Sequence, residues 1–179
     1  EEPTEPEEPV EPEQPEEPDA PTEPEEEIPP IQLPEGAILE FDESLRIEAN
    51  KISNLNLDKL TVLEIRELIN TNLTAEFYNS KNEKIEEDTK IGTGSKLVLK
   101  DELGEVVYEY IFIIYGDING DGEINSLDVL IIQKHILEIK EITGIFLKSA
   151  NTSKNGTLPS SLDVLRIQKH ILEIKFIEQ

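Results

Sequence analysis

The spacing of apolar and polar residues changes twice along the chain and divides it into three regions. Residues 1–35 contain few apolar residues and repeat Glu and Pro. Proline removes backbone donors and like charges repel, so we expect an extended, disordered linker there. Residues 36–115 alternate apolar and polar positions in short runs, which is typical of strands. Residues 116–179 instead place apolar residues at helical spacing, in two separate segments.

The middle region is predicted to be a small α+β accessory module. Thr61 and Glu64 have the spacing of a capping box, which predicts a helix from there to about Asn70. A single capped helix among strands favours a β-grasp-like fold over an Ig-like sandwich. Strands are expected where apolar and polar residues alternate between turn residues, at 37–41, 45–49, 75–78, 96–99 and 106–114.

Three aromatic residues of the last predicted strand share one face, because side chains alternate along a strand. They are Tyr108, Tyr110 and Phe112. Such a row could stack on sugar rings, which would make the chain a cell-surface adhesion or glycan-binding fragment. The alternatives are a core face or a contact with the C-terminal region. We favour the core, because this module has few other aromatic residues to fill it.

An internal repeat and an oxygen-rich loop define the C-terminal region. Residues 127–140 recur at 162–175 and differ only at Ile131, which is Arg166 in the second copy. Before the first copy, oxygen-bearing side chains occupy loop positions 1, 3, 5, 9 and 12, with Gly122 at position 6. Ca²⁺ takes six to eight oxygens, and glycine permits the sharp bend. The ligands assigned to this first site are Asp117, Asn119, Asp121, Glu123 through its carbonyl, Asn125 through a water, and Asp128 in bidentate fashion.

A calcium loop that opens a helix, duplicated in tandem, resembles a type I dockerin. The residues before Asp117 alternate like a strand, so the first loop lacks the entering helix of an ordinary EF-hand, as in that family. The resemblance implies a small all-α fold of two calcium-loop–helix repeats, with Ca²⁺ as cofactor and a cohesin module as partner. It also implies non-catalytic docking, a secreted or cell-surface location, and a parent protein that acts on carbohydrate.

The second loop departs from the first in length and in charge. Aligning Gly156 with Gly122 makes the second loop one residue longer, and it has one metal-binding carboxylate where the first loop has three. Fewer ligand charges lower calcium affinity steeply, so we expect this site to be weak or metal-free, with local hydrogen bonds holding its shape. Its candidate ligands are Asn151, Ser153, Asn155, Thr157 and Asp163.

Each repeated helix carries two stripes of side chains. The apolar stripe is predicted to pack the two helices together, and it comprises Val129, Ile132, Ile136, Ile139 and their equivalents Val164, Ile167, Ile171 and Ile174. The second stripe mixes Leu with polar residues, and its leucines Leu130 and Leu137 could instead belong to the core. By the family resemblance the second stripe would contact cohesin in two nearly equivalent orientations, through Ser126, Leu127, Gln133, Lys134 and Leu137 or through Ser161, Leu162, Gln168, Lys169 and Leu172.

Charge and composition exclude several other functions. Of the formal charge of −24, residues 1–35 carry −15, and no cluster of Lys and Arg is present to bind nucleic acid. The chain has no cysteine and no run of 18 apolar residues that could span a membrane. His135 and His170 recur with identical neighbours, which is unusual for catalytic residues. We therefore expect no enzyme activity, a monomer when free, and three units: linker 1–35, accessory module 36–115 and dockerin 116–179.

Overall fold

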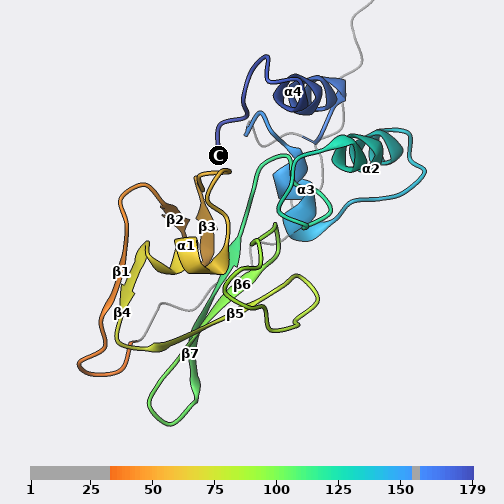
Figure 1. Ribbon diagram of the computed structural model, residues 1–179. Helices are drawn as coiled ribbons and strands as arrows, with labels where there is room; N and C mark the ends of the chain where they lie inside the picture. Colours follow the sequence, from red (N-terminus) through yellow and green to blue (C-terminus); the bar gives the residue numbers. More distant parts are fainter. Residues whose placement is uncertain (1–32, 155–157) are drawn as a thin grey trace, which may run out of the picture.

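The computed structural model describes residues 33–154 and 158–179, and these form a mixed α and β structure (Figure 1). The predicted linker, apart from its last three residues, lies outside the described residues. In chain order the elements are β1 (Leu39–Phe41), β2 (Arg46–Glu48), β3 (Lys51–Ser53), α1 (Val62–Arg66), β4 (Ile69–Thr71), β5 (Thr74–Tyr78), β6 (Lys96–Lys100), β7 (Val106–Phe112), α2 (Ser126–Ile136), α3 (Gly144–Ala150) and α4 (Ser161–Ile171).

A five-stranded mixed sheet organises the accessory module. Its strand order is β2-β3-β7-β6-β5, and β1 pairs separately with β4. The neighbours β3 and β7 run parallel, whereas β7, β6 and β5 form an antiparallel run. Strands β3 and β4 were not predicted from the sequence. Each has three residues, too few for a periodic pattern, and each exists because a distant strand pairs with it.

The predicted helix of the accessory module is present but shorter than expected. The capping box is confirmed: Glu64 N donates to Thr61 Oγ1, and Thr61 N donates to Glu64 Oε2 at 3.0 Å. The helix ends at Arg66, not near Asn70 as predicted. Residues 69–71 form β4 instead, because Ile69 pairs with Phe41 of β1 and this tertiary pairing overrides the local helical pattern.

The aromatic row of β7 belongs mainly to the core. Tyr110 and Phe112 are fully buried, and Tyr108 packs against Tyr110 with ring centroids 4.9 Å apart. Phe112 also stacks on Phe77 of β5. The core therefore uses the row that could otherwise have stacked on sugars, and burial raises the pKa of Tyr110 to about 12.

Three helices form the C-terminal region, one more than predicted. Helix α3 leads into the second loop, so only the first loop lacks an entering helix. Its N-cap Thr143 makes no side-chain capping hydrogen bond and Gly144 has φ +58°, so neither residue gives the usual signal of a helix start. Ser149 and Ala150 of α3 are buried, and Ala150 belongs to the apolar cluster that joins the helices.

The apolar stripe of the repeated helices is only half as long as predicted. Val129, Ile132 and their equivalents Val164 and Ile167 are buried, but Ile136 and Ile171 are exposed. Ile139 and Ile174, each 68% exposed, lie beyond the helices. The cause is the same in both copies: Glu138 and Glu173 have φ of +56°, which turns the chain away from the helix axis.

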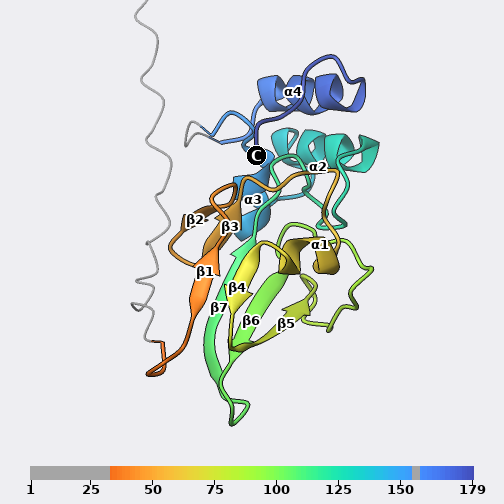
Figure 2. The same ribbon diagram turned by 60° about the vertical axis from the view of Figure 1, so that its left-hand side comes forward.

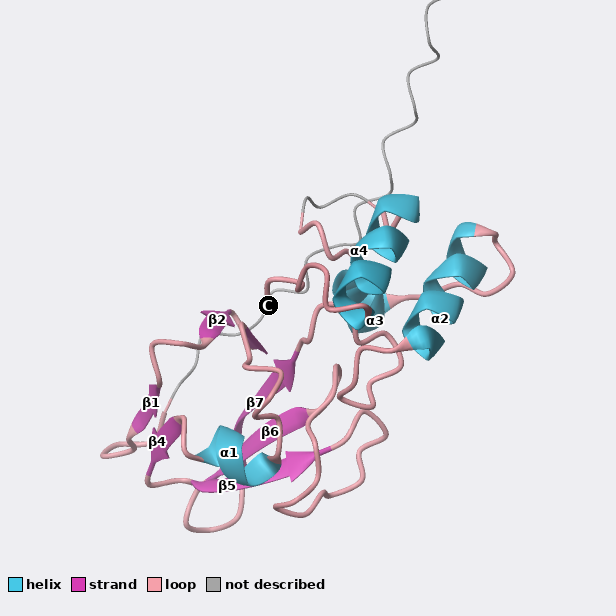
Figure 3. Ribbon diagram, turned by 45° about the horizontal axis from the view of Figure 1, so that its top comes forward, coloured by secondary structure: helices cyan, strands magenta, loops and turns pink. Residues whose placement is uncertain are grey.

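The helices lie at the end of the sheet where β7 leaves it. Figures 1 and 2 show α3 between the sheet and the pair formed by α2 and α4, and Figure 3 shows α2 and α4 side by side. Two buried apolar clusters result. One contains the sheet and α1, the other contains α2, α3 and α4, and Ile124 packs against both.

Candidate functional site

Two buried carboxylates hold the first loop together. Asp117 and Asp128 are fully buried. Asp117 accepts hydrogen bonds from the amides of Gly120 at 2.7 Å and Gly122 at 3.2 Å. Asp128 accepts from Ile118 at 2.8 Å and, across the loop, from Asn125 at 2.9 Å. Asp117 and Asp128, the first and last predicted ligands, are therefore both hydrogen-bonded to backbone amides between residues 118 and 125.

The predicted ligands between them lie closer to solvent. Asn119 and Asp121 bond to each other, with Asn119 Nδ2 donating to Asp121 Oδ2 at 2.7 Å. The carboxylate of Glu123 pairs with Lys90 Nζ at 2.7 Å, which leaves the role assigned to its main-chain carbonyl unaffected. Asn125 is the N-cap of α2 and accepts from Leu127 N at 2.8 Å. Its side chain thus begins the helix.

The two buried carboxylates of the first loop, Asp117 and Asp128, lie close together with no ion-pair partner of their own among the described residues. Burial raises the pKa of Asp117 to about 6, and the charge of Asp128 raises it further, against the amide donors that lower it. Burial also raises the pKa of Asp128. In the described part of the chain, no Lys or Arg forms an ion pair with either carboxylate. Two uncompensated buried carboxylates make a bound cation favourable here.

The donor chemistry of this loop fits Ca²⁺. All six assigned residues offer oxygen, which hard divalent cations prefer. Over the described ranges, no three acidic or histidine side chains converge closely enough to form a metal cluster by themselves. The absence of such a cluster from the described residues follows from the composition of the loop, because only three of the assigned ligands bind through carboxylates. One of these, Asp121, is exposed on a turn with Asn119.

The second loop is organised by its own hydroxyl groups. Asp163 is buried and accepts from Thr152 Oγ1 at 3.0 Å and from Ser153 N at 3.1 Å. Ser153 Oγ donates to Asn151 Oδ1 at 2.7 Å. The predicted ligands Asn155 and Thr157 lie outside the described residues.

A cation lies beside the one carboxylate of the second loop. Arg166 Nη1 lies 3.9 Å from Asp163 Oδ1. Arg166 occupies the single position at which the two repeats differ, and its equivalent is Ile131. The second loop therefore has fewer carboxylates and also a positive charge nearby.

The two sets of predicted docking residues are exposed in the same pattern. Leu127 and Leu162 are 54% and 52% exposed, and Leu137 and Leu172 are each 68% exposed. The polar members match as well: Ser126, Gln133, Ser161 and Gln168 are exposed, and Lys134 and Lys169 are half-buried. Leu130 and Leu165 are also exposed, so neither is a core residue between the helices.

The two repeats also make matching contacts after the ends of α2 and α4. His135 Nδ1 accepts from Ile142 N at 3.1 Å, and His170 Nδ1 accepts from Ile177 N at 3.3 Å. Both isoleucines are buried. The two histidines therefore fix the chain after each helix in the same way.

Comparison with known families identifies this region. Residues 115–172 match the family model of the dockerin type I domain. This match confirms the predicted dockerin-like module in the C-terminal region. Dockerins are non-catalytic modules that bind cohesin modules in a calcium-dependent way. No significant match to the chain was found among curated proteins or among solved structures. No helix in the described ranges is long and apolar enough to cross a bilayer.

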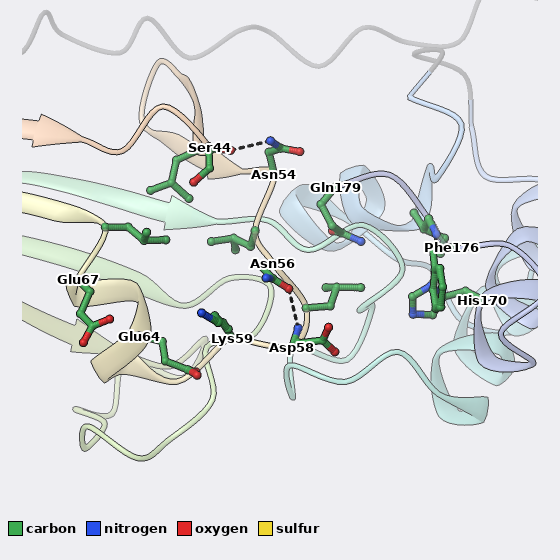
Figure 4. Close-up of a pocket in the computed structure, with 15 residues that line it drawn as sticks. Ser44, Asn54, Asn56, Asp58, Lys59, Glu64, Glu67, His170, Phe176 and Gln179 are labelled. Carbon is green, nitrogen blue, oxygen red and sulfur yellow. Dashed lines mark hydrogen bonds between the residues drawn. The ribbon is translucent and has the colours of Figure 1, made fainter.

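An open groove of about 840 Å³ lies where the dockerin meets the accessory module (Figure 4). His170 and Phe176 line it from the dockerin side. Asn54, Asp58 and Glu64 line it from the accessory module. Phe176 and the His170 imidazole supply the aromatic rings among the lining residues, so the groove offers little surface for stacking a sugar.

Sequence reasoning missed three residues that shape the loops. Thr152 and Arg166 contact Asp163, and Thr93 N donates to Asp117 Oδ2 from a position 24 residues earlier. The difference between Ile131 and Arg166 was a visible signal for the second residue. No sequence signal indicated Thr93, because its contact depends on how the two modules pack.

Proposed function

We propose that the chain attaches a secreted, carbohydrate-active parent protein to a cohesin module of a scaffold, in a calcium-dependent way and in two alternative orientations. The observation that carries this is the matched exposure of the two sets of docking residues on α2 and α4. A partner that contacts one set would meet the same chemistry after a rotation of about 180°.

We assign the first loop as the principal calcium site, with the six ligands predicted from its spacing. When bound, Ca²⁺ would supply the positive charge that the buried carboxylates lack. Asp128 connects this site to docking, because it closes the loop and also bonds to the N-cap of α2. Ser126 and Leu127 directly follow that cap, so the position of the loop sets where the docking stripe begins.

We assign the second loop as weak or metal-free. Its one buried carboxylate already accepts bonds from Thr152 and Ser153 and lies near Arg166. These contacts provide the shape and charge balance that a metal ion would otherwise supply.

The remaining parts of the proposal concern organisation. We place the boundaries at 1–35, 36–115 and 116–179, supported by two apolar clusters that meet at residues 113–115, where Ile114 belongs to the first cluster and Ile113 and Tyr115 belong to the second. The β-grasp-like assignment is supported by a short helix packed on a mixed sheet whose early strand β3 lies parallel to its last strand β7. We further propose an extracellular location, typical of dockerin proteins, and a monomer when free.

Paired substitutions test the two orientations. Leu127→Asp and Leu162→Asp place a charge at equivalent points of the two faces, and the affinity for a type I cohesin is measured by calorimetry in calcium. Each single variant should keep binding within about tenfold of wild type, because the other face remains available. The double variant should lose binding. Loss of binding in one single variant alone would show that only one orientation exists.

A loop variant tests the link between calcium and docking. Asp117→Ala combined with Asp128→Ala removes two ligand charges and four of the hydrogen bonds described for the loop, so it should greatly weaken docking in calcium. Asp163→Ala is the matched control and should retain at least one docking orientation. If the double variant docks normally, the first loop does not organise the face.

No specific observation favours the alternative of direct glycan binding. The aromatic row of β7 is largely buried, and the groove at the junction offers few aromatic rings. Binding to a glycan array that persists after deletion of residues 116–179 would support that alternative.

A further inference from the structure

A segment of the accessory module, residues 90–95, lies directly against the first calcium loop. At Gly92 an added Cβ would lie 2.2 Å from the carbonyl oxygen of Gly120 and 2.8 Å from Gly122 N. The contact is reciprocal, because a Cβ at Gly120 would lie 2.7 Å from Thr93 O. The two backbones therefore touch, with no room for a side chain between them.

A hydrogen bond from this segment reaches a predicted calcium ligand. Thr93 N donates to Asp117 Oδ2 at 2.8 Å, and both residues are fully buried. Asp117 thus accepts from three amides, two in its own loop and one in the other module. An ionised carboxylate has about four acceptor positions, so capacity remains for a cation.

The same segment is firmly attached to the sheet. Thr93 Oγ1 donates to Ile114 O at 3.0 Å and accepts from Ile114 N at 3.1 Å. Gly94 N donates to Phe112 O at 2.9 Å. The amide that reaches Asp117 is therefore fixed by the end of β7, the strand that leads into the loop.

The second loop is held differently. Asp163, the equivalent of Asp128, accepts from Thr152 and Ser153 of its own loop. The amide of Thr93 in the accessory module thus contacts the first loop, and neither Asp117 nor Asp128 forms an ion pair with a Lys or Arg among the described residues.

We propose that residues 90–95 position the first calcium site, so that the accessory module and calcium binding are energetically coupled. The inference rests on the proposed function in one respect, the assignment of Asp117 as a calcium ligand. Thr93 orients the carboxylate and Gly92 allows the approach that makes this bond. Partners that orient metal ligands are worth about 10- to 100-fold in metal affinity, and an effect of that size is expected here.

Gly92→Ala in the full chain tests this directly. Gly92 does not have a positive φ, so alanine suits its backbone conformation and acts only by separating the two backbones. Calcium calorimetry should show affinity at the tight site reduced about 10- to 100-fold. Gly104→Ala is the control: it lies in a turn of the same module with φ +83° and open space around it, so it strains the module without touching the loop. It should leave calcium affinity within about twofold of wild type.

A second pair of variants covers the case in which Gly92→Ala does not fold. Thr93→Val keeps the side-chain volume but removes both hydrogen bonds to Ile114, whereas Thr93→Ser keeps them. Thr93→Val should bind calcium about tenfold more weakly, and Thr93→Ser should remain close to wild type. Hydrogen exchange of the Thr93 amide gives a readout independent of docking, and it should slow when calcium is added to the wild-type chain.

The outcomes separate this inference from the function on which it rests. If the wild-type chain binds no calcium, the calcium site itself is wrong and the inference fails with it. If the wild-type chain binds calcium and a folded Gly92→Ala or Thr93→Val binds it equally well, only the positioning role is overturned.

Discussion

At the scale of single residues, Asp117 is subject to opposing requirements. It must be ionised to bind a cation, but its burial raises its pKa to about 6 and so favours the protonated form. The amides of Thr93, Gly120 and Gly122 partly offset this by donating to the carboxylate. The calcium-free fold therefore retains an acid that gains a proton on folding at mildly acidic pH.

This predicts an unusual pH dependence for the calcium-free protein. Because the pKa of Asp117 in the folded state lies above its ordinary value of 3.8, the native state binds more protons than the unfolded state between about pH 4 and 6. Asp117 should therefore make the free energy of unfolding fall as pH rises through that window, by on the order of 2–3 kcal/mol, and then level off. Urea unfolding in chelator measures it, with Asp117→Asn as the comparison. A wild-type curve parallel to that of the Asn variant would contradict the prediction.

The single difference between the repeats predicts a difference in calcium affinity. Arg166→Ile removes the cation 3.9 Å from Asp163 and should raise calcium affinity at the second loop. Because Arg166 is partly exposed, the effect should be about 1 kcal/mol or less, up to roughly fivefold. Ile131→Arg is the matched converse and should weaken the first site. Calorimetry that detects neither change would show that the arginine does not influence the loops.

At the scale of elements, each repeated helix begins on the carboxylate that ends its loop. Asn125 and Ser160 are N-caps with capping boxes, and the third residue after each cap is Asp128 or Asp163. The same carboxylate thus fixes the loop and the helix start. This arrangement connects the proposed calcium loop to the start of the proposed docking stripe.

Removing the N-cap side chains of α2 and α4 should distinguish their effect on helix stability from their effect on calcium binding. Asn125→Ala and Ser160→Ala should each lower the free energy of unfolding by about 1 kcal/mol, the usual value of an N-cap. Calcium affinity at the first loop should fall only for Asn125→Ala. Urea unfolding together with calcium calorimetry on both variants measures this, and equal calcium affinities would contradict it.

The elements also show how far sequence reasoning reaches. Local signals were sufficient for the capping box at Thr61 and for the presence of α2 and α4. They were insufficient for β4, which forms because Ile69 pairs with Phe41, and for α3, whose start lacks a capping bond. The stripe through Ile136 and Ile139 was predicted too long because the left-handed residue Glu138 is not a glycine and gave no warning. Within the site, the spacing of the first loop suggested six candidate ligands, which stay a prediction, and it gave no indication that Thr93 contacts Asp117.

At the scale of the whole molecule, the accessory module and the dockerin share a continuous interface. Within residues 90–95, Gly94 also lies close to Phe146 of α3, and outside that segment Lys148 Nζ lies 3.8 Å from Glu48 of β2. The C-terminal Gln179 bonds to both backbone groups of Tyr115, where the two modules join. The modules should therefore unfold together.

Calcium should accordingly stabilise both modules. Binding to the native state alone raises the unfolding free energy by about 2.7 kcal/mol at 100 times the dissociation constant. Thermal unfolding followed through the buried Tyr110 of the accessory module should shift upward with calcium, together with the helical signal. If only the helical signal shifts, the two modules are uncoupled.

The central claim is calcium-dependent docking, and one measurement tests it most directly. The full chain is titrated with type I cohesin modules in calcium, and the same preparation is titrated again after a chelator removes the metal. We predict binding to at least one cohesin in calcium, loss of that binding in chelator, and recovery when calcium is restored. Cohesin binding of equal strength with and without calcium would contradict the account.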